Sequence, residues 1–198
     1  MIRICHCKGG DMYFSSSGPA NTAEVIKIAV KEAVKRQISH IIAASNTGAT
    51  ILALAEEAGK QKYGGKLVCV SHVYGFAKNG ENELSEKTRE DLEKRGIRVC
   101  TAAHVLSGAE RGLSRKYQGI YPLEIIANCL RMFGQGSKVC VEISVMALDA
   151  GLVPYGKPII ALGGSNGGAD TALLLTPAYA STVMETKIRE ILCKPNEF

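Results

Sequence analysis

The 198-residue chain is long enough to bury the core of one domain, and its 46% hydrophobic and 22% charged residues are ordinary for a globular protein. The net charge of +5 arises from 24 basic residues scattered among 19 acidic ones, without a basic stripe or aromatic platforms, which argues against nucleic-acid binding. There is no apolar run of about eighteen residues to cross a membrane, and the N-terminus lacks the apolar region of a signal peptide. We therefore expect a cytoplasmic protein with one domain over residues 1–198.

Short β-branched segments alternate with helical segments along the chain. Asn21 or Thr22 can cap the first helix, with Glu24 three residues after Asn21 in a near capping box, and the helix continues to Arg36. Further helices are predicted over residues 48–62, 84–95 and 123–133, and strands over 38–44, 66–71, 97–101, 157–162 and 171–175. Residues 186–193 form an element of uncertain type. Such alternation is typical of a parallel sheet covered by helices.

Residues 137–150 fit two patterns. Apolar residues alternate along the first half as they do in a strand, whereas the length of the segment and the stop at Gly151 favour a helix. We predict a helix. Its Glu142 then needs a partner, because a buried carboxylate without one is costly. The expected partner is an Arg or Lys from residues 111–116, and a donor from a ligand is the alternative.

Five of the seven cysteines lie in apolar segments and are expected to be small buried side chains: Cys69, Cys100, Cys129, Cys140 and Cys193. Cys5 and Cys7 flank His6 in the only tight group. Structural zinc sites usually separate paired cysteines by two to four residues and need four ligands. A single intervening residue and the lack of a second pair argue against a metal site here.

The segment SNTGAT at residues 45–50 lies directly between a predicted strand and a predicted helix. The first N–H groups of a helix have no partners within the helix, and the helix dipole adds positive charge there, so a phosphate is favoured at this point. Ser45, Asn46, Thr47 and Thr50 supply further hydrogen-bonding groups, and Gly48 allows a close approach of the backbone. The alternative is simple helix capping. The pattern matches neither a Walker P-loop nor a dinucleotide-binding motif.

Three other segments are expected at the same edge of the sheet. The glycine-rich stretch at residues 163–171 offers exposed N–H groups, with a plain hairpin as the alternative. Residues 72–76 and 104–116 each follow a strand as a polar loop. His72 and His104 are candidates for proton transfer near neutral pH, although a structural role is the commoner one for a histidine after a strand.

Five motifs that together span nearly the whole chain give it a resemblance to a known family: ASNTGAT at 44–50, GENE at 80–83, HVLSGAER at 104–111, KVCVEI at 138–143 and GGSNGGADTA at 163–172. The chain resembles the stand-alone proteins, found mainly in archaea and some bacteria, that are similar to the carboxyl-terminal α/β domain of pyruvate kinase. The resemblance implies an α/β fold, a three-layer α/β/α sandwich with a mostly parallel sheet. The stand-alone proteins look like binders of flavin mononucleotide (FMN), whose phosphate the turn at 45–50 would hold.

The resemblance also limits the expected chemistry. In pyruvate kinase this domain carries no catalytic residues, and the matching turn binds a phosphate of an allosteric sugar bisphosphate in many members. The (β/α)₈ barrel that performs the reaction typically takes about 250 residues, so pyruvate kinase activity is not expected of these 198 residues.

The leading hypothesis is binding of a small phosphorylated molecule, FMN above all, with no metal. The residues expected to bind it are Ser45, Asn46, Thr47, Gly48, Ala49, Thr50, His104, Leu106, Ser107, Gly163, Gly164, Ser165, Asp170 and Thr171. The alternative is a sensor of a sugar phosphate or another nucleotide that performs no chemistry. A hydrolase or transferase using His72 or His104 with Glu110 ranks last. The apolar segments at 123–133 and 137–150 favour a homo-oligomer.

Overall fold

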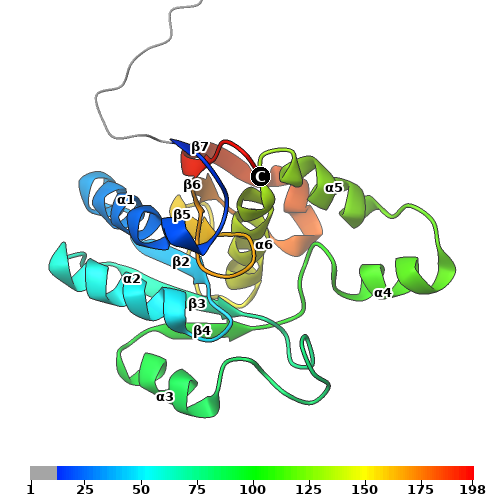
Figure 1. Cartoon of the computed structure of the whole chain (residues 1–198), viewed down its shortest axis with the longest axis horizontal. Helices are drawn as coiled ribbons and strands as arrows, with labels where there is room; N and C mark the ends of the chain where they lie inside the picture. The colour runs from blue at the N-terminus through cyan, green and yellow to red at the C-terminus, as the bar shows by residue number, and fades with distance from the viewer. Residues whose placement is uncertain (1–12) are drawn as a thin grey trace, which may run out of the picture.

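A computed structural model describes residues 13–198 of the chain (Figure 1). The helices are α1 (Thr22–Arg36), α2 (Ala49–Lys60), α3 (Glu86–Lys94), α4 (Gly108–Tyr117), α5 (Pro122–Arg131) and α6 (Gln135–Asp149). The strands are β1 (Tyr13–Phe14), β2 (His40–Ala44), β3 (Lys66–Ser71), β4 (Arg98–Thr101), β5 (Ile159–Gly163), β6 (Thr171–Thr176) and β7 (Lys187–Pro195). Two short 3₁₀ helices are η1 (Pro19–Asn21) and η2 (Ala180–Glu185).

The strands form one sheet in the order β1-β7-β6-β5-β2-β3-β4. The four strands from β5 to β4 are parallel, and Ile42 at the centre is aligned with Val68 on β3 and with Ala161 on β5. β6 is antiparallel to both of its neighbours. Both faces of the central strands are buried, which explains their nearly continuous apolar sequences. The sheet is mostly parallel, as predicted.

Helices cover both faces of the sheet, which gives three layers (Figure 1). On one face α1, α2 and α3 bury side chains such as Val25, Ile51 and Leu92 against the sheet. On the other face α6 lies against the sheet and α5 packs on α6, which leaves α6 buried along almost its whole length. This arrangement confirms the predicted α/β fold.

The predicted helices and strands are present with bounds that agree within two residues, and the ambiguous segment at 137–150 is helical. Of the unassigned residues 186–193, all but Thr186 belong to β7, an added strand. Two local predictions are wrong. The Asn21 side chain does not cap α1, because its amide donates to the carbonyl oxygen of Ser16. Residues 104–116 are not simply a loop, because most of them form α4, which has no buried residue.

The burial pattern corrects two further expectations. Cys129 on α5 is exposed, whereas Cys69, Cys100, Cys140 and Cys193 are buried as predicted. The apolar residues of α6 are buried within one chain along almost its whole length, so they serve as core and leave little apolar surface for the oligomer interface that the sequence suggested. Cys5, His6 and Cys7 lie outside the described residues. Between residues 13 and 198, no helix has both the length and the apolar character needed to cross a bilayer.

Candidate functional site

The turn between β2 and α2 lies at the carboxyl edge of the parallel strands, where ligands bind in open α/β sheets. Ser45 is buried; its N–H donates to the carbonyl oxygen of Val70 at 3.0 Å, and its hydroxyl oxygen accepts from the N–H of Ile51 at 3.3 Å. Gly48 has a φ of 93°, and a Cβ atom there would lie 2.5 Å from Cγ2 of Thr88. Both features require glycine, so the turn is held in one conformation by β3 on one side and α3 on the other.

Three backbone amides at the start of α2 remain free. Within the described chain, the N–H groups of Gly48, Ala49 and Thr50 donate to no acceptor. The next amide, that of Ile51, is the one capped by Ser45. α2 is 12 residues long, so its aligned peptide dipoles add partial positive charge at this end. The turn therefore presents an unsatisfied group of donors to an anion.

A cavity of about 610 Å³ lies against this turn. Its walls come from the turn, from the glycine-rich loop after β5, from the end of β3 and from α6. The lining residues are Ala44, Ser45, Asn46, Thr47, Ala49, Thr50, His72, Glu83, Gln135, Val139, Gly164, Asn166, Gly167 and Gly168. The volume lies within the range of about 300–1,000 Å³ that is typical of small-molecule sites.

The glycine-rich loop is ordered by Asp170, whose side chain is completely buried. One carboxylate oxygen accepts hydrogen bonds from the N–H groups of Gly18, at 3.0 Å, and Ser165, at 3.1 Å. The other oxygen accepts from the hydroxyl of Thr171 at 2.8 Å. Gly168 packs so closely on Pro19 and Thr22 that no side chain would fit there. The side chains of Asp170 and Thr171 thus hold the loop from its buried side, and neither residue lines the cavity.

A second, smaller cavity of about 140 Å³ adjoins the first, and both are bordered by Ala44, Asn46, His72, Gln135 and Val139. Three rings meet in it. The centroid of the His72 ring lies 3.8 Å from that of Phe76 and 5.2 Å from that of His104. Nδ1 of His72 is 2.7 Å from a carboxylate oxygen of Glu83. Burial lowers the pKa of His104 below its ordinary value, and the carboxylate of Glu142 only partly opposes this.

Glu142 is paired within its own helix. One of its oxygens lies 2.5 Å from Nζ of Lys138, one turn earlier on α6, and the other accepts from the N–H of Leu106 at 3.0 Å. The partner predicted from residues 111–116 is therefore wrong. Both side chains are only 6% exposed. Burial lowers the pKa of Lys138, and the adjacent Glu142 carboxylate opposes that shift.

The structure brings several of the predicted binding residues together. Ser45, Asn46, Thr47, Ala49, Thr50 and Gly164 line the larger cavity, and His104 and Ser107 line the smaller one. Leu106, Gly163, Asp170 and Thr171 are buried beneath these surfaces, while Gly48 and Ser165 shape the two loops. Glu110 accepts from the N–H groups of Leu123 and Glu124 at the start of α5, which is a structural role.

Some lining residues were not predicted from the sequence. Glu83, Gln135 and Lys138 all border the cavities. Lys138 had a readable signal, since it precedes Glu142 by four residues, the spacing of a helical ion pair. The pairing of Glu83 with His72 joins residues 11 positions apart across an irregular loop, for which a sequence offers no pattern.

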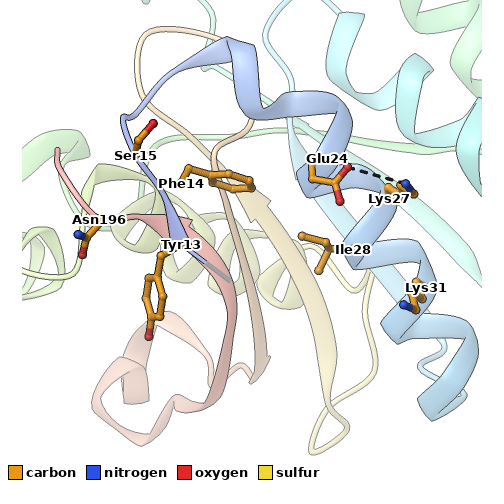
Figure 2. A pocket seen from close by; sticks show the side chains of 8 residues that line it. All are labelled: Tyr13, Phe14, Ser15, Glu24, Lys27, Ile28, Lys31 and Asn196. Atoms are coloured by element: carbon orange, nitrogen blue, oxygen red, sulfur yellow. Dashed lines mark ion pairs between the residues drawn. The ribbon is translucent and has the colours of Figure 1, made fainter. Parts of the chain in front are cut away.

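A third cavity, of about 640 Å³, lies between β1 and α1 and is shown in Figure 2. Its lining includes Phe14, Ile28 and Lys31, together with Glu24, which pairs with Lys27 at 4.0 Å. None of the predicted binding residues borders it. Within residues 13–198, no group of three or more His, Cys, Asp or Glu side chains has a metal-binding arrangement. The edge beside α2 therefore remains the candidate site.

The fold and this edge define a class: a three-layer α/β/α protein with paired cavities at the carboxyl ends of its parallel strands. The family profile of the pyruvate kinase alpha/beta domain matches residues 23–175, and the chain belongs to this family. The matched segment includes the turn, both cavities and the strands that support them.

Three solved structures of pyruvate kinase from Cryptosporidium parvum are similar to this chain. One is 15% identical with a TM-score of 0.41, covering 81% of this chain and 23% of that protein. The second, in complex with ADP, is 16% identical with a TM-score of 0.39 over 80% and 24%. The third is 15% identical with a TM-score of 0.36 over 75% and 22%. This chain thus spans less than a quarter of their length, and similarity at this level carries no information on function.

Proposed function

We propose that the protein binds a phosphorylated small molecule at the carboxyl edge of its sheet, with the phosphate on the N-terminus of α2 and FMN as the first candidate. The observation that carries the proposal is the set of three free amides at Gly48, Ala49 and Thr50 beside a cavity of about 610 Å³. Elsewhere in a folded protein, buried or partly buried amides are almost always paired. A phosphate would satisfy all three and would also favour the positive end of the helix dipole.

The side chains of the turn support a phosphate in the same place. Thr47 is exposed beside the free amides, and Asn46 is partly exposed at the junction of the two cavities. Neither makes a side-chain hydrogen bond within the described chain, so both can donate to a ligand. Ser45 is already committed to the Ile51 amide and acts by holding the turn.

FMN fits the chemistry of the remaining walls. The glycine loop presents backbone without side chains at Gly167 and Gly168, so a flat ring can approach closely. The ring of His72, which packs on Phe76, borders the larger cavity at the other end and offers a surface for stacking. A bound flavin would supply electron transfer, and the protein would bind, orient and shield it. These residues suggest no substrate for such a reaction, and the proposal assigns none of pyruvate kinase's chemistry to them.

The test compares FMN with riboflavin, which lacks the phosphate. Both are titrated into the protein and followed by quenching of flavin fluorescence. Charge-assisted hydrogen bonds contribute roughly 1.5–3 kcal/mol each, so losing the phosphate is expected to weaken binding by about 100-fold or more. Equal affinity for the two flavins would contradict the phosphate site, and absence of binding by both would contradict FMN as the ligand.

The second candidate is a sensor that binds a sugar phosphate and performs no chemistry. It is favoured by membership of the pyruvate kinase alpha/beta domain family and by the three cations, Arg111, Arg131 and Lys138, near the turn. Thermal unfolding in the presence of sugar phosphates and of FMN separates the two candidates. A rise in melting temperature with a sugar phosphate and none with FMN would support the sensor.

A further inference from the structure

The smaller cavity differs from the larger one in size and in charge. At about 140 Å³ it lies well below the range of about 300–1,000 Å³ found for whole small-molecule sites. It suits one functional group of a ligand and not a nucleotide. Its lining comes from the end of β3, from the segments that follow β3 and β4, and from α4, α5 and α6. We call it the anion pocket, defined by His72, His104, Arg111, Arg131, Lys138 and Glu142.

The charges around the anion pocket do not balance. Three cations face one carboxylate, that of Glu142. Glu142 is bonded to Lys138 and to the Leu106 amide, and within the described chain it forms no ion pair with either arginine. Glu83 lines the larger cavity, and one of its carboxylate oxygens lies 2.7 Å from Nδ1 of His72. The pocket therefore has an excess of positive charge that its own residues leave uncompensated.

The hydrogen bonding of Lys138 is the strongest indication that the anion pocket binds an anion. Its side chain is 94% buried, and an ammonium group has three hydrogen-bond donors. Within the described chain only one of these is used, in the bond to Glu142. Buried ammonium groups are costly unless they are paired and hydrogen-bonded. An oxyanion in the pocket would accept from the remaining donors.

Arg111 and Arg131 lie at the rim with their charges available. No carboxylate in the described part of the chain forms an ion pair with either guanidinium. Arg131 is fixed in place by bonds to Gln135 and Asn128, both at 2.8 Å and both to neutral oxygens. Arg111 is exposed on α4. A guanidinium can hold a carboxylate through two parallel hydrogen bonds, and either Arg111 or Arg131 can provide them.

We propose that the anion pocket binds a carboxylate group, held by Lys138, Arg111 and Arg131, next to the phosphorylated ligand in the larger cavity. The inference deepens the proposed function and rests on it for the identity of the neighbouring ligand. His72 borders both cavities, so the carboxylate and the phosphorylated ligand meet at its ring. The carboxylate belongs either to that ligand itself or to a small second substrate.

The first experiment uses acetate as the probe and the four histidines of the chain as reporters. Acetate is titrated at constant ionic strength, and the imidazole C–H signals are followed by NMR. Saturable shifts are expected for His72 and His104. His40, at the opposite end of β2 from the site, is expected to stay unchanged. Shifts that rise linearly without saturation, or that are equal at His40, would overturn the proposal.

A matched pair of variants on α4 locates the effect. Arg111 lines the pocket, whereas Arg115, one turn further along the same helix, does not. Both are exposed, so neither variant is expected to disturb folding. Arg111→Gln is expected to weaken acetate binding about tenfold, and Arg115→Gln is expected to leave it unchanged. Equal effects of the two variants would show a general loss of positive charge and would contradict the pocket.

Repeating the titration with bound FMN separates the two sources of the carboxylate and the two proposals. Acetate binding alongside FMN supports a second substrate, and competition between them supports a carboxylate or other oxyanion on one ligand that extends into the pocket. Acetate binding without any FMN binding would leave the pocket standing and overturn FMN as its neighbour. FMN binding with no saturable acetate binding would overturn the pocket and leave the phosphate site intact.

Discussion

Two loops at the carboxyl edge of the sheet, residues 45–48 and 164–170, share a composition rich in Gly, Ser and Asn and differ in what their polar groups do. The first leads into three free amides at the start of α2. In the second, the Ser165 amide and the Gly18 amide it meets are both bonded to Asp170. The first loop therefore leads free donors into the positive end of a helix dipole, whereas the second is anchored by a buried carboxylate. The amides of Gly164, Asn166, Gly167 and Gly168 in the second loop also donate to no acceptor in the described part of the chain, and they line the same cavity.

Composition alone therefore does not distinguish a loop that leads into a helix terminus from one that is anchored by a buried side chain. The difference lies in a single buried carboxylate: Asp170 accepts from the Ser165 amide of its loop, whereas no carboxylate in the described part of the chain accepts from the amides of residues 48–50. A binding site requires hydrogen-bond donors that have no partner within the protein. Such unpaired donors lower the stability of the fold until a ligand accepts their hydrogen bonds.

Asp170→Ala removes the carboxylate that orders the glycine loop. It leaves the amides of Gly18 and Ser165 without their acceptor and is expected to lower the free energy of unfolding by about 3 kcal/mol or more, measured by urea denaturation. Asp170→Asn keeps one acceptor oxygen and is the control, with less than half that loss expected. Equal stability of Asp170→Ala and the wild type would contradict the internal role of Asp170.

Gly48→Ala tests the fixed conformation of the turn. The substitution combines a φ of 93° with a clash against Thr88, so a loss of about 1–2 kcal/mol is expected in the same assay. Gly59→Ala, within the same helix and in open space, is the control and is expected to stabilise by roughly 0.5–1 kcal/mol. If both variants were neutral, the backbone of the turn would not be constrained as described.

Thr22→Val tests how the glycine loop is attached to α1. The Thr22 hydroxyl oxygen accepts from the N–H of Ala169 at 2.9 Å, and its loss is expected to cost about 1 kcal/mol. Thr22→Ser retains the hydroxyl and should cost less than half as much. The same cost for both variants would mean that packing of the methyl group, and not this hydrogen bond, holds the loop.

Thr47→Ala is expected to have the smallest effect on stability, within about 0.5 kcal/mol, because the side chain is exposed and makes no hydrogen bond within the described chain. Affinity for FMN is expected to fall about three- to tenfold through the loss of one donor. Thr182→Ala, exposed on η2 away from both cavities, is the control and should change neither quantity. Unchanged affinity in Thr47→Ala would remove Thr47 from the site.

Much of the fold could be predicted because its elements are long and strongly patterned. The strand at Lys66–Ser71 was predicted to the residue, since a continuous apolar run bounded by glycine and polar residues has few alternatives. α4 was missed because its stability does not come from a buried face: Leu113 and Tyr117 are exposed, and Gly108 and Gly112 weaken the helical pattern. Propensity and periodicity give little signal for such a helix.

The site was predictable only in part. The position of the turn after a strand predicted its place at the carboxyl edge, and that placement is confirmed. The internal role of Asp170 depends on Gly18, which is 152 residues away along the chain, and the pairing of His72 with Glu83 depends on the path of an irregular loop. Contacts of this kind are set by tertiary structure and leave no local pattern in the sequence.

The free amides at the start of α2 can be tested directly by NMR of the backbone N–H groups during addition of FMN. The account predicts downfield shifts of the Gly48, Ala49 and Thr50 amide protons as they bond to the phosphate, with none on addition of riboflavin. The Ser165 amide, already bonded to Asp170, is expected to move little. FMN binding that shifts Ser165 and leaves the three α2 amides unchanged would contradict the central claim.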